Sequence, residues 1–318
     1  MDEFEYEKIK KNDTIDFYDN TYLKASNLNS SIRYELELLN QLDLFTRKHS
    51  ENVATITYNL CRKLHLPKGF TEYCVTCAYI HDLGKMFIPQ EVLQKNGALT
   101  QEEFEIIKTH TTLGYNLCQT DKQLKPYSAG PYYHHEALDG SGYPQGLTKP
   151  DIPYEAQIIR VADEFDALVS KRQYKSHIDI SDSLKIIIEN TKPSPNAPQN
   201  TKYSKEGKDN KNIVKKLIKV VIDDTNYEIS CLMDYMDYLK QEIKRFKKID
   251  SLVKKRDSSK KDKDYQYYND YIKLYLKKNE PIEKIYDIYN DFLNTYNEKD
   301  KNLKKLFNEI KIIKSLKV

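Results

Sequence analysis

Apolar residues recur at helical spacing through most of the chain. From residue 32 to residue 66 they return every three or four positions, until Pro67 and Gly69 break the pattern. Thr100 and Glu103 have the spacing of a capping box, which marks the start of another helix. Further apolar stripes predict helices over about 71–85, 100–118 and 154–170. Because no segment shows the apolar–polar alternation of a half-buried strand, the pattern predicts an all-α protein.

Two polar stretches divide this helical pattern. Residues 138–153 are crowded with Gly and Pro, which is typical of a loop. Residues 191–212 are rich in Asn, Pro, Ser and Lys, so they read as a disordered linker or an insertion. The predicted segments are an N-terminal arm or helix (1–31), a helical core domain (32–190), the polar linker (191–212) and a C-terminal helical region of unknown role (213–318).

The composition excludes several classes of protein. Of the 318 residues, 39% are hydrophobic and 31% are charged, as in a soluble globular protein. No apolar run reaches the roughly 18 residues of a membrane span, and the N-terminus lacks the pattern of a signal peptide. Five scattered cysteines predict free thiols and a cytoplasmic location. Cys74 and Cys77 lie inside an apolar run, which favours core packing over a redox or zinc role.

Positive charge gathers near the C-terminus. Residues 240–318 contain 22 Lys or Arg and 13 Asp or Glu, a net charge of +9, whereas the whole chain carries +3. Such a region could bind nucleic acid or an acidic surface. A solvated helical face in a Lys-rich protein is the simpler interpretation, so we do not expect a nucleic-acid partner.

Histidines and aspartates supply the candidate chemistry. Among seven histidines, His81 precedes Asp82 at the end of an apolar run, and His134 adjoins His135 before the Gly-rich loop. Ionisable groups are costly to bury beside apolar residues unless they are paired or bound to a metal. Neutral imidazoles with a carboxylate suit zinc, iron or manganese, and Asp82 could bridge two metals through its two oxygens. The alternative is a satisfied polar cluster without a metal.

Lys85 lies on the same helical face as His81 and Asp82. Its ammonium group would repel a metal at contact distance, but it would interact well with a phosphate that the metal holds. The alternative is a surface lysine that complements the dipole at a helix C-terminus.

These residues belong to a series of separated motifs. The motifs are H-S-E-N-V-A at 49–54, H-D-L-G-K at 81–85, His at 110, H-H-E-A-L-D-G-S-G-Y-P at 134–144, I-I-R-V-A-D-E-F-D-A-L at 158–168 and S-K-R-Q-Y-K at 170–175. In this order and spacing, over about residues 32–190, the chain resembles the HD-GYP subgroup of the HD-domain phosphohydrolases. The resemblance implies an all-α HD-domain helical bundle, here followed by an additional C-terminal helical region.

The resemblance also implies two adjacent divalent metal ions, often iron or manganese. One metal would be held by His49, His81, Asp82 and Asp163, and the other by His110, His134 and His135, with Asp82 bridging. Lys85 would lie beside the bridging hydroxide and the scissile phosphate, and Tyr143 would contact the nucleotide. Arg172 and Lys175 would hold the ligand's phosphates, unless they simply form a basic helix end.

Some members bind a third metal through a Glu four residues before the first ligand histidine. Phe45 occupies that position here and cannot ligate, so we expect two metals. A second departure is Asn96, where the family usually has Pro. Glu136 and Asp166 are candidates to accept hydrogen bonds from the ligand imidazoles.

The implied activity is hydrolysis of cyclic di-GMP to linear pGpG, and sometimes on to GMP, by a hydroxide that the two metals activate. Two alternatives stay open. The protein could be an HD-type phosphohydrolase for another nucleotide, such as cyclic GMP-AMP, or a catalytically quiet sensor or scaffold that binds the dinucleotide. The C-terminal helices could form a homodimer, dock a signalling protein or cover the active site.

Overall fold

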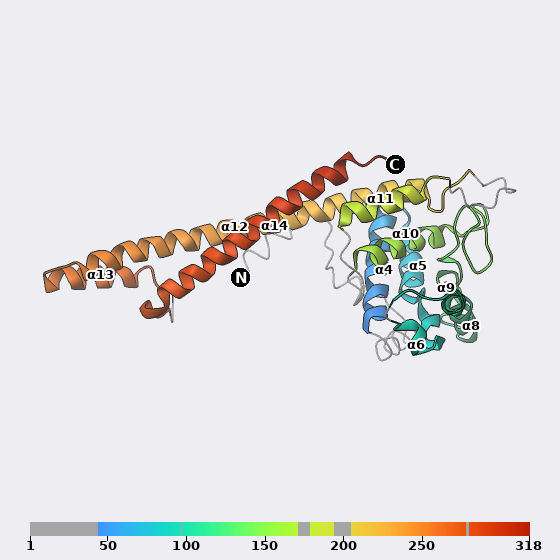
Figure 1. Cartoon of the computed structure of the whole chain (residues 1–318), viewed down its shortest axis with the longest axis horizontal. Coiled ribbons are helices and arrows are strands. Elements are labelled where there is room, and N and C mark those ends of the chain that lie inside the picture. The colour runs from blue at the N-terminus through green and yellow to red at the C-terminus, as the bar shows by residue number, and fades with distance from the viewer. Residues whose placement is uncertain (1–43, 96, 171–178, 194–204, 278–279) are drawn as a thin grey trace. The chain divides into compact units, whose positions relative to one another are not determined.

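The computed structural model describes residues 44–95, 97–170, 179–193, 205–277 and 280–318 (Figure 1). The α-helices within these ranges are α4 (Leu44–Lys63), α5 (Lys68–Ile80), α6 (Gln90–Leu93), α7 (Gln101–Lys108), α8 (His110–Thr120), α9 (Ala129–Tyr133), α10 (Tyr154–Val169), α11 (Ile180–Asn190), α12 (Lys211–Asp257), α13 (Asp262–Lys273) and α14 (Ile285–Ser315). Three short 3₁₀ helices accompany them: η1 (Leu83–Phe87), η2 (Lys125–Tyr127) and η3 (Ile282–Lys284). In these ranges the β-type pairing is limited to an isolated bridge between Asp139 and Thr148, so the predicted all-α fold is confirmed.

The chain divides into two compact units. The first contains the described residues up to Asp223 together with Ile313–Val318, and the second is Asp224–Ile312. The segment boundaries that we derived from the sequence stay predictions, as does the role of the C-terminal helices.

Helices α4, α5 and α10 surround the core of the first unit. Leu60 of α4, Ile80 of α5 and Ile158 of α10 are fully buried there. Burying a side chain of this size contributes about 1.5–3 kcal/mol each. Cys74 and Cys77 are free thiols in the same core, as their apolar surroundings in the sequence predict.

The helix predicted over 71–85 is shorter than expected. Helix α5 ends at Ile80, and the chain continues as the 3₁₀ helix η1. Gly84 accounts for this geometry, because a Cβ atom there would lie 1.8 Å from the carbonyl oxygen of His110. With glycine, η1 approaches the start of α8 closely enough to bring Asp82 near His110.

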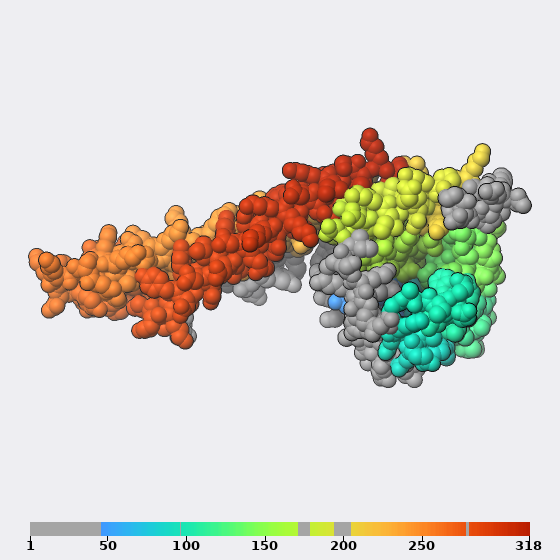
Figure 2. All heavy atoms as spheres, viewed as in Figure 1, coloured from blue at the N-terminus to red at the C-terminus, as the bar shows by residue number. Residues whose placement is uncertain are grey.

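The helix predicted over 100–118 is also divided, because α7 ends at Lys108 and α8 begins at His110. The predicted capping box does form at the start of α7. The Glu103 amide donates to Thr100 Oγ1 at 3.2 Å, and the Thr100 amide donates to Glu103 Oε2 at 2.7 Å. Figure 2 shows the surface around α6 and α7, in teal, on the outside of the first unit.

The second unit has a small core of its own. Phe246, Ile249 and Leu252 of α12 pack with Ile272 of α13 and Ile285 of α14. Beside this core, Arg245 forms ion pairs with Glu242 and Glu280, each at 2.7 Å.

Candidate metal centre

Seven side chains that lie far apart in the sequence converge on one place in the first unit. His49 comes from α4, His81 and Asp82 follow α5, His110 begins α8, His134 and His135 follow α9, and Asp163 lies on α10. They form three overlapping groups: His49, His81 and Asp163; His81, Asp82 and His134; and His110, His134 and His135. Within each group the potential ligand atoms lie within 4.8 Å of one another. The structure therefore brings together all seven ligands that the sequence predicted.

Fixed acceptors orient four of these imidazoles through Nδ1. His81 Nδ1 lies 2.7 Å from Ala78 O, His110 Nδ1 lies 2.6 Å from Ile107 O, and His134 Nδ1 lies 2.9 Å from Gly130 O. A carbonyl oxygen can only accept a hydrogen bond, so Nδ1 of each ring must carry the proton. His49 Nδ1 contacts a carboxylate oxygen of Asp166 at 2.7 Å. In the neutral rings, each Nε2 atom then presents a lone pair.

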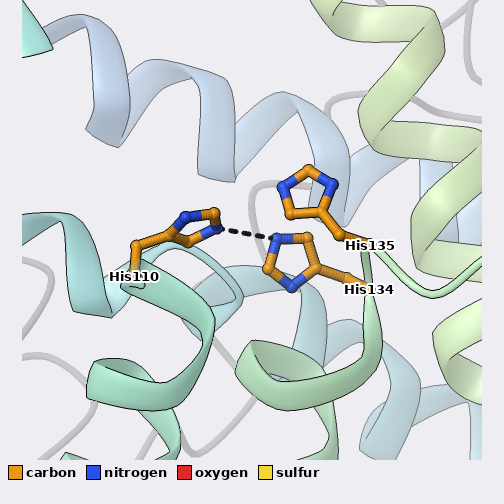
Figure 3. A group of neighbouring side chains, drawn as sticks. All are labelled: His110, His134 and His135. Atoms are coloured by element: carbon orange, nitrogen blue, oxygen red, sulfur yellow. Dashed lines mark hydrogen bonds between the residues drawn. The ribbon is translucent and has the colours of Figure 1, made fainter. Parts of the chain in front are cut away.

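The Nε2 atoms of His110 and His134 lie only 3.2 Å apart (Figure 3). Burial lowers the pKa of His110 to about 4 and also lowers the pKa of His134 well below its usual value, so both rings are neutral near pH 7. Because both rings are protonated at Nδ1, this contact sets two lone pairs against each other. A cation shared by the two nitrogen atoms would remove that conflict.

Among the described residues, the buried atoms that lack a hydrogen-bond partner include three at this centre: His49 Nε2, His81 Nε2 and Asp82 Oδ1. Unpaired buried polar atoms of this kind are costly and call for an explanation, such as an ion. These observations fit a metal better than a self-satisfied polar cluster. The donor set of imidazole nitrogens and carboxylate oxygens suits first-row divalent metals.

The carboxylates at this centre are ionised. Burial disfavours the charged form of Asp82, but the positive charges of His81 and Lys85 outweigh burial and hold its pKa well below the usual value. For Asp163, burial is likewise outweighed, here by a hydrogen bond and the charge of His49, and the pKa is lowered.

Burial alone would lower the pKa of His49, but its contacts with Asp163 and Asp166 raise that pKa to about 9. His110, His134 and His135 are neutral, so His49 is the imidazole that would have to lose a proton to bind a metal.

Lys85 lies in η1 and donates a hydrogen bond to Asp82 Oδ2. Its side chain is 18% exposed, whereas that of Asp82 is 1% exposed. The ammonium group is therefore placed at the predicted bridging carboxylate and keeps some access to solvent.

The two residues expected to accept hydrogen bonds from the ligand imidazoles differ in their contacts. Asp166 accepts from His49, as expected, and its other oxygen accepts from Asn52 Nδ2 at 3.0 Å and from Ser170 Oγ at 2.8 Å. Glu136 instead accepts from loop amides, those of Gln145 at 2.7 Å and Leu147 at 2.8 Å. We did not predict a role for Asn52, although its position three residues after His49 on one helix could have suggested it.

Tyr143 lies at the edge of the centre and stacks on His135, with ring centroids 4.7 Å apart. Phe104 of α7 meets the Tyr143 ring edge-on at 6.4 Å. The Lys108 ammonium lies 5.3 Å from the Phe104 centroid and 5.7 Å from that of Tyr143. We did not predict a role for Phe104 or Lys108. Their i,i+4 spacing in the sequence places them on one face of α7, and the structure shows that α7 has no buried residue.

Arg172 and Lys175, the predicted phosphate-binding residues, lie outside the described residues, as does Asn96. The side chain of Phe45 is outside them too, so the expectation of two metals rather than three stays a prediction. No helix in the described part of the chain has both the length and the apolar character that crossing a membrane requires.

Comparison with known proteins gives matches over the same part of the chain. A family model described as "HD domain" matches residues 34–193, about half of the sequence. The chain is 40% identical over 147 residues to a cyclic di-GMP phosphodiesterase of Thermotoga maritima, which covers 44% of this chain and 40% of that protein.

Two other relatives show the range of named substrates. The cyclic di-GMP phosphodiesterase response regulator RpfG of Xanthomonas campestris is 40% identical over 39% of this chain and 34% of its own length. The 3′3′-cGAMP-specific phosphodiesterase 1 of Vibrio cholerae is 33% identical over 45% of this chain and 33% of its own length. The matched region thus spans less than half the length of each of these relatives.

Proposed function

The chain belongs to the HD domain family, and on that premise we propose that it is a metal-dependent phosphodiesterase that hydrolyses cyclic di-GMP. The observation that carries the proposal is the convergence of imidazole nitrogens and ionised carboxylates around Asp82. Relatives named cyclic di-GMP phosphodiesterases support the choice of substrate. The product would be linear pGpG, and sometimes GMP.

The proposed centre would hold two divalent metals, iron or manganese. His49, His81 and Asp163 would hold one, and His110, His134 and His135 the other, with Asp82 shared between them. When bound, the metals would supply a nucleophilic water at neutral pH and positive charge for the phosphate oxygens.

The protein's own residues would then hold the phosphodiester in place. Lys85, whose ammonium group is fixed by Asp82, would stabilise negative charge that builds on the non-bridging phosphate oxygens. Arg172 and Lys175 would hold the phosphates of the cyclic dinucleotide.

A base of the substrate would stack on the aromatic pair formed by Tyr143 and Phe104. Phe104 is 42% exposed, although a large aromatic side chain is usually buried. The Lys108 ammonium beside both rings adds a donor for a base carbonyl or a phosphate. Stacking of this kind is sequence-tolerant, because every base has a π-face.

A second candidate substrate is 3′3′-cGAMP, because a relative named as specific for it is 33% identical over 45% of this chain. The phosphate chemistry is the same for both dinucleotides, so the metal centre does not distinguish them. Selectivity would depend on the base contacts.

The test is hydrolysis by the full-length protein after anaerobic loading with Fe²⁺ or Mn²⁺. Cyclic di-GMP and 3′3′-cGAMP are supplied separately, and nucleotide products are separated by chromatography. We expect turnover of cyclic di-GMP, with loss of activity in Asp82→Ala. A control at an exposed aspartate is Asp182→Asn, because Asp182 of α11 pairs with Lys185 one turn further along the same helix. Tight binding of a dinucleotide without any turnover would instead indicate a sensor.

A further inference from the structure

A buried ion pair lies directly behind two of the proposed ligands. Arg160 of α10 donates from Nε to Asp209 Oδ1 at 2.8 Å. The Arg160 side chain is 16% exposed and that of Asp209 is fully buried. Removing two charges from water is costly, and the position of this pair beside the proposed ligands suggests a role at the metal centre.

Arg160 reaches the metal centre in two ways. It lies three residues before Asp163, on the same face of α10. Its Nη1 also donates to the carbonyl oxygen of His135, at the longer distance of 3.4 Å. The rigid guanidinium fork therefore connects Asp209 with the backbone of one ligand and with the helix that carries another.

The segment that supplies Asp209 returns to this place from far along the chain. Residues 205–210 lie near the end of the polar stretch 191–212, which resembles a linker in composition, and α12 begins within that stretch at Lys211. The Leu138 amide donates to Lys208 O at 3.0 Å, which ties the segment to the loop after His135. The Asp209 amide donates to Asn190 O at 3.1 Å, at the end of α11.

Two more contacts fix the segment. Asn210 Nδ2 donates to Gln157 Oε1 at 2.8 Å, one turn before Arg160 on α10. At Gly207 a Cβ atom would come within 2.3 Å of the Thr191 carbonyl carbon, so the backbones touch there. Contacts of the residues before and after Asp209 thus fix its backbone, and its carboxylate lies against Arg160.

We propose that Asp209 is a positioning residue of the metal centre: by holding Arg160 against the His135 carbonyl, it fixes the side of the site formed by His135 and Asp163. The inference rests on the proposed metal centre but not on the identity of the substrate. Without Asp209, Arg160 Nε loses its carboxylate acceptor, and the guanidinium group is no longer held against the His135 carbonyl.

The test measures Mn²⁺ affinity by calorimetry in the full chain, with thermal unfolding recorded for each variant. Partners outside the ligand shell typically change metal affinity 10–100-fold. We expect Asp209→Asn to weaken Mn²⁺ binding about tenfold while the protein stays folded at the assay temperature. Arg160→Gln should weaken it by a similar factor, and the double variant should bind no more weakly than the weaker single variant, since both changes break one connection.

The matched control is Asn210→Ala, which removes two hydrogen bonds of the same segment, to Gln157 and from the Asn212 amide, but leaves Arg160 paired. We expect a lower melting temperature with Mn²⁺ affinity within about twofold of the wild type, because neither lost hydrogen bond involves Asp209 or Arg160. Unchanged affinity in folded Asp209→Asn, an equal loss in Asn210→Ala, or additive losses in the double variant would each overturn the inference. Wild-type protein that binds no Mn²⁺ would overturn the proposed metal centre itself, whereas binding without hydrolysis would overturn only the proposed activity.

Discussion

Replacing Asp166 tests whether the outer hydrogen bonds of the metal centre matter. The Asp166 side chain is buried, and it accepts from His49 Nδ1 at 2.7 Å through one oxygen and from Asn52 and Ser170 through the other. In Asp166→Ala all three donors lose their acceptor. The His49 ring is then no longer fixed with Nε2 toward Asp82 and Asp163, which lie 3.6 Å and 2.9 Å from that atom.

The size of the effect follows from the kind of bond. A hydrogen bond to a charged group contributes about 1.5–3 kcal/mol, which corresponds to roughly 10–150-fold in an equilibrium constant. We therefore expect Asp166→Ala to weaken Mn²⁺ binding within this range. Asp166→Asn keeps the shape and one neutral acceptor, and a neutral hydrogen bond is about half as strong. Its loss should be smaller, roughly tenfold or less.

The assay is calorimetric titration of metal-free protein with Mn²⁺, with hydrolysis of cyclic di-GMP measured on the same samples. Asp182→Asn makes the same chemical change at an exposed position and should match the wild type. Folded Asp166→Ala that binds Mn²⁺ and turns over substrate within about twofold of the wild type would refute the reasoning, as would a larger loss in Asp166→Asn than in Asp166→Ala.

Three further predictions concern the metal, the aromatic pair and a close backbone contact. Removal of the metal by EDTA dialysis should lower the melting temperature, since metal at 100 times its Kd stabilises the fold by about 2.7 kcal/mol. Equal melting temperatures of the dialysed protein with and without added Mn²⁺ would contradict this. Phe104→Ala should raise KM for cyclic di-GMP by roughly 5–150-fold with little change in kcat, because base stacking contributes about 1–3 kcal/mol. Steady-state kinetics test this, and Tyr267→Ala, a change at another exposed aromatic residue, should leave KM unchanged. Gly84→Ala should reduce Mn²⁺ affinity and stability, because its Cβ would lie 1.8 Å from His110 O. The control Gly69→Ala, with nothing within 4 Å of its Cβ, should have the melting temperature and the Mn²⁺ affinity of the wild type.

The residues that converge at the candidate metal centre could be picked out from the sequence because their chemistry is local and unusual. A His-Asp pair after an apolar run and adjacent histidines before a Gly-rich loop are rare enough to indicate a site, and the motif series gave the remaining members. The orientation of the rings could not be predicted. The acceptors for His81, His110 and His134 are backbone carbonyls, which every residue possesses.

The sequence pattern also did not predict the close backbone contact of Gly84 or the docking of the segment that contains Asp209. Helical periodicity continues past Ile80, but α5 ends there, and the following 3₁₀ helix brings Gly84 against the start of α8. Asp209 lies in a polar stretch whose composition resembles that of a linker, yet it is buried and paired with Arg160, 49 residues earlier. The composition of a segment indicates its average polarity, but it does not reveal that one of its residues forms a buried ion pair.

The most direct test of the two-metal centre is the metal content of the full-length protein after anaerobic purification and loading with Mn²⁺ or Fe²⁺. Elemental analysis should find two metal ions per chain in the wild type and a loss of metal in Asp82→Ala, because Asp82 is the carboxylate shared by both proposed sites. Folded wild-type protein that retains no metal, or Asp82→Ala protein that retains two, would contradict the account.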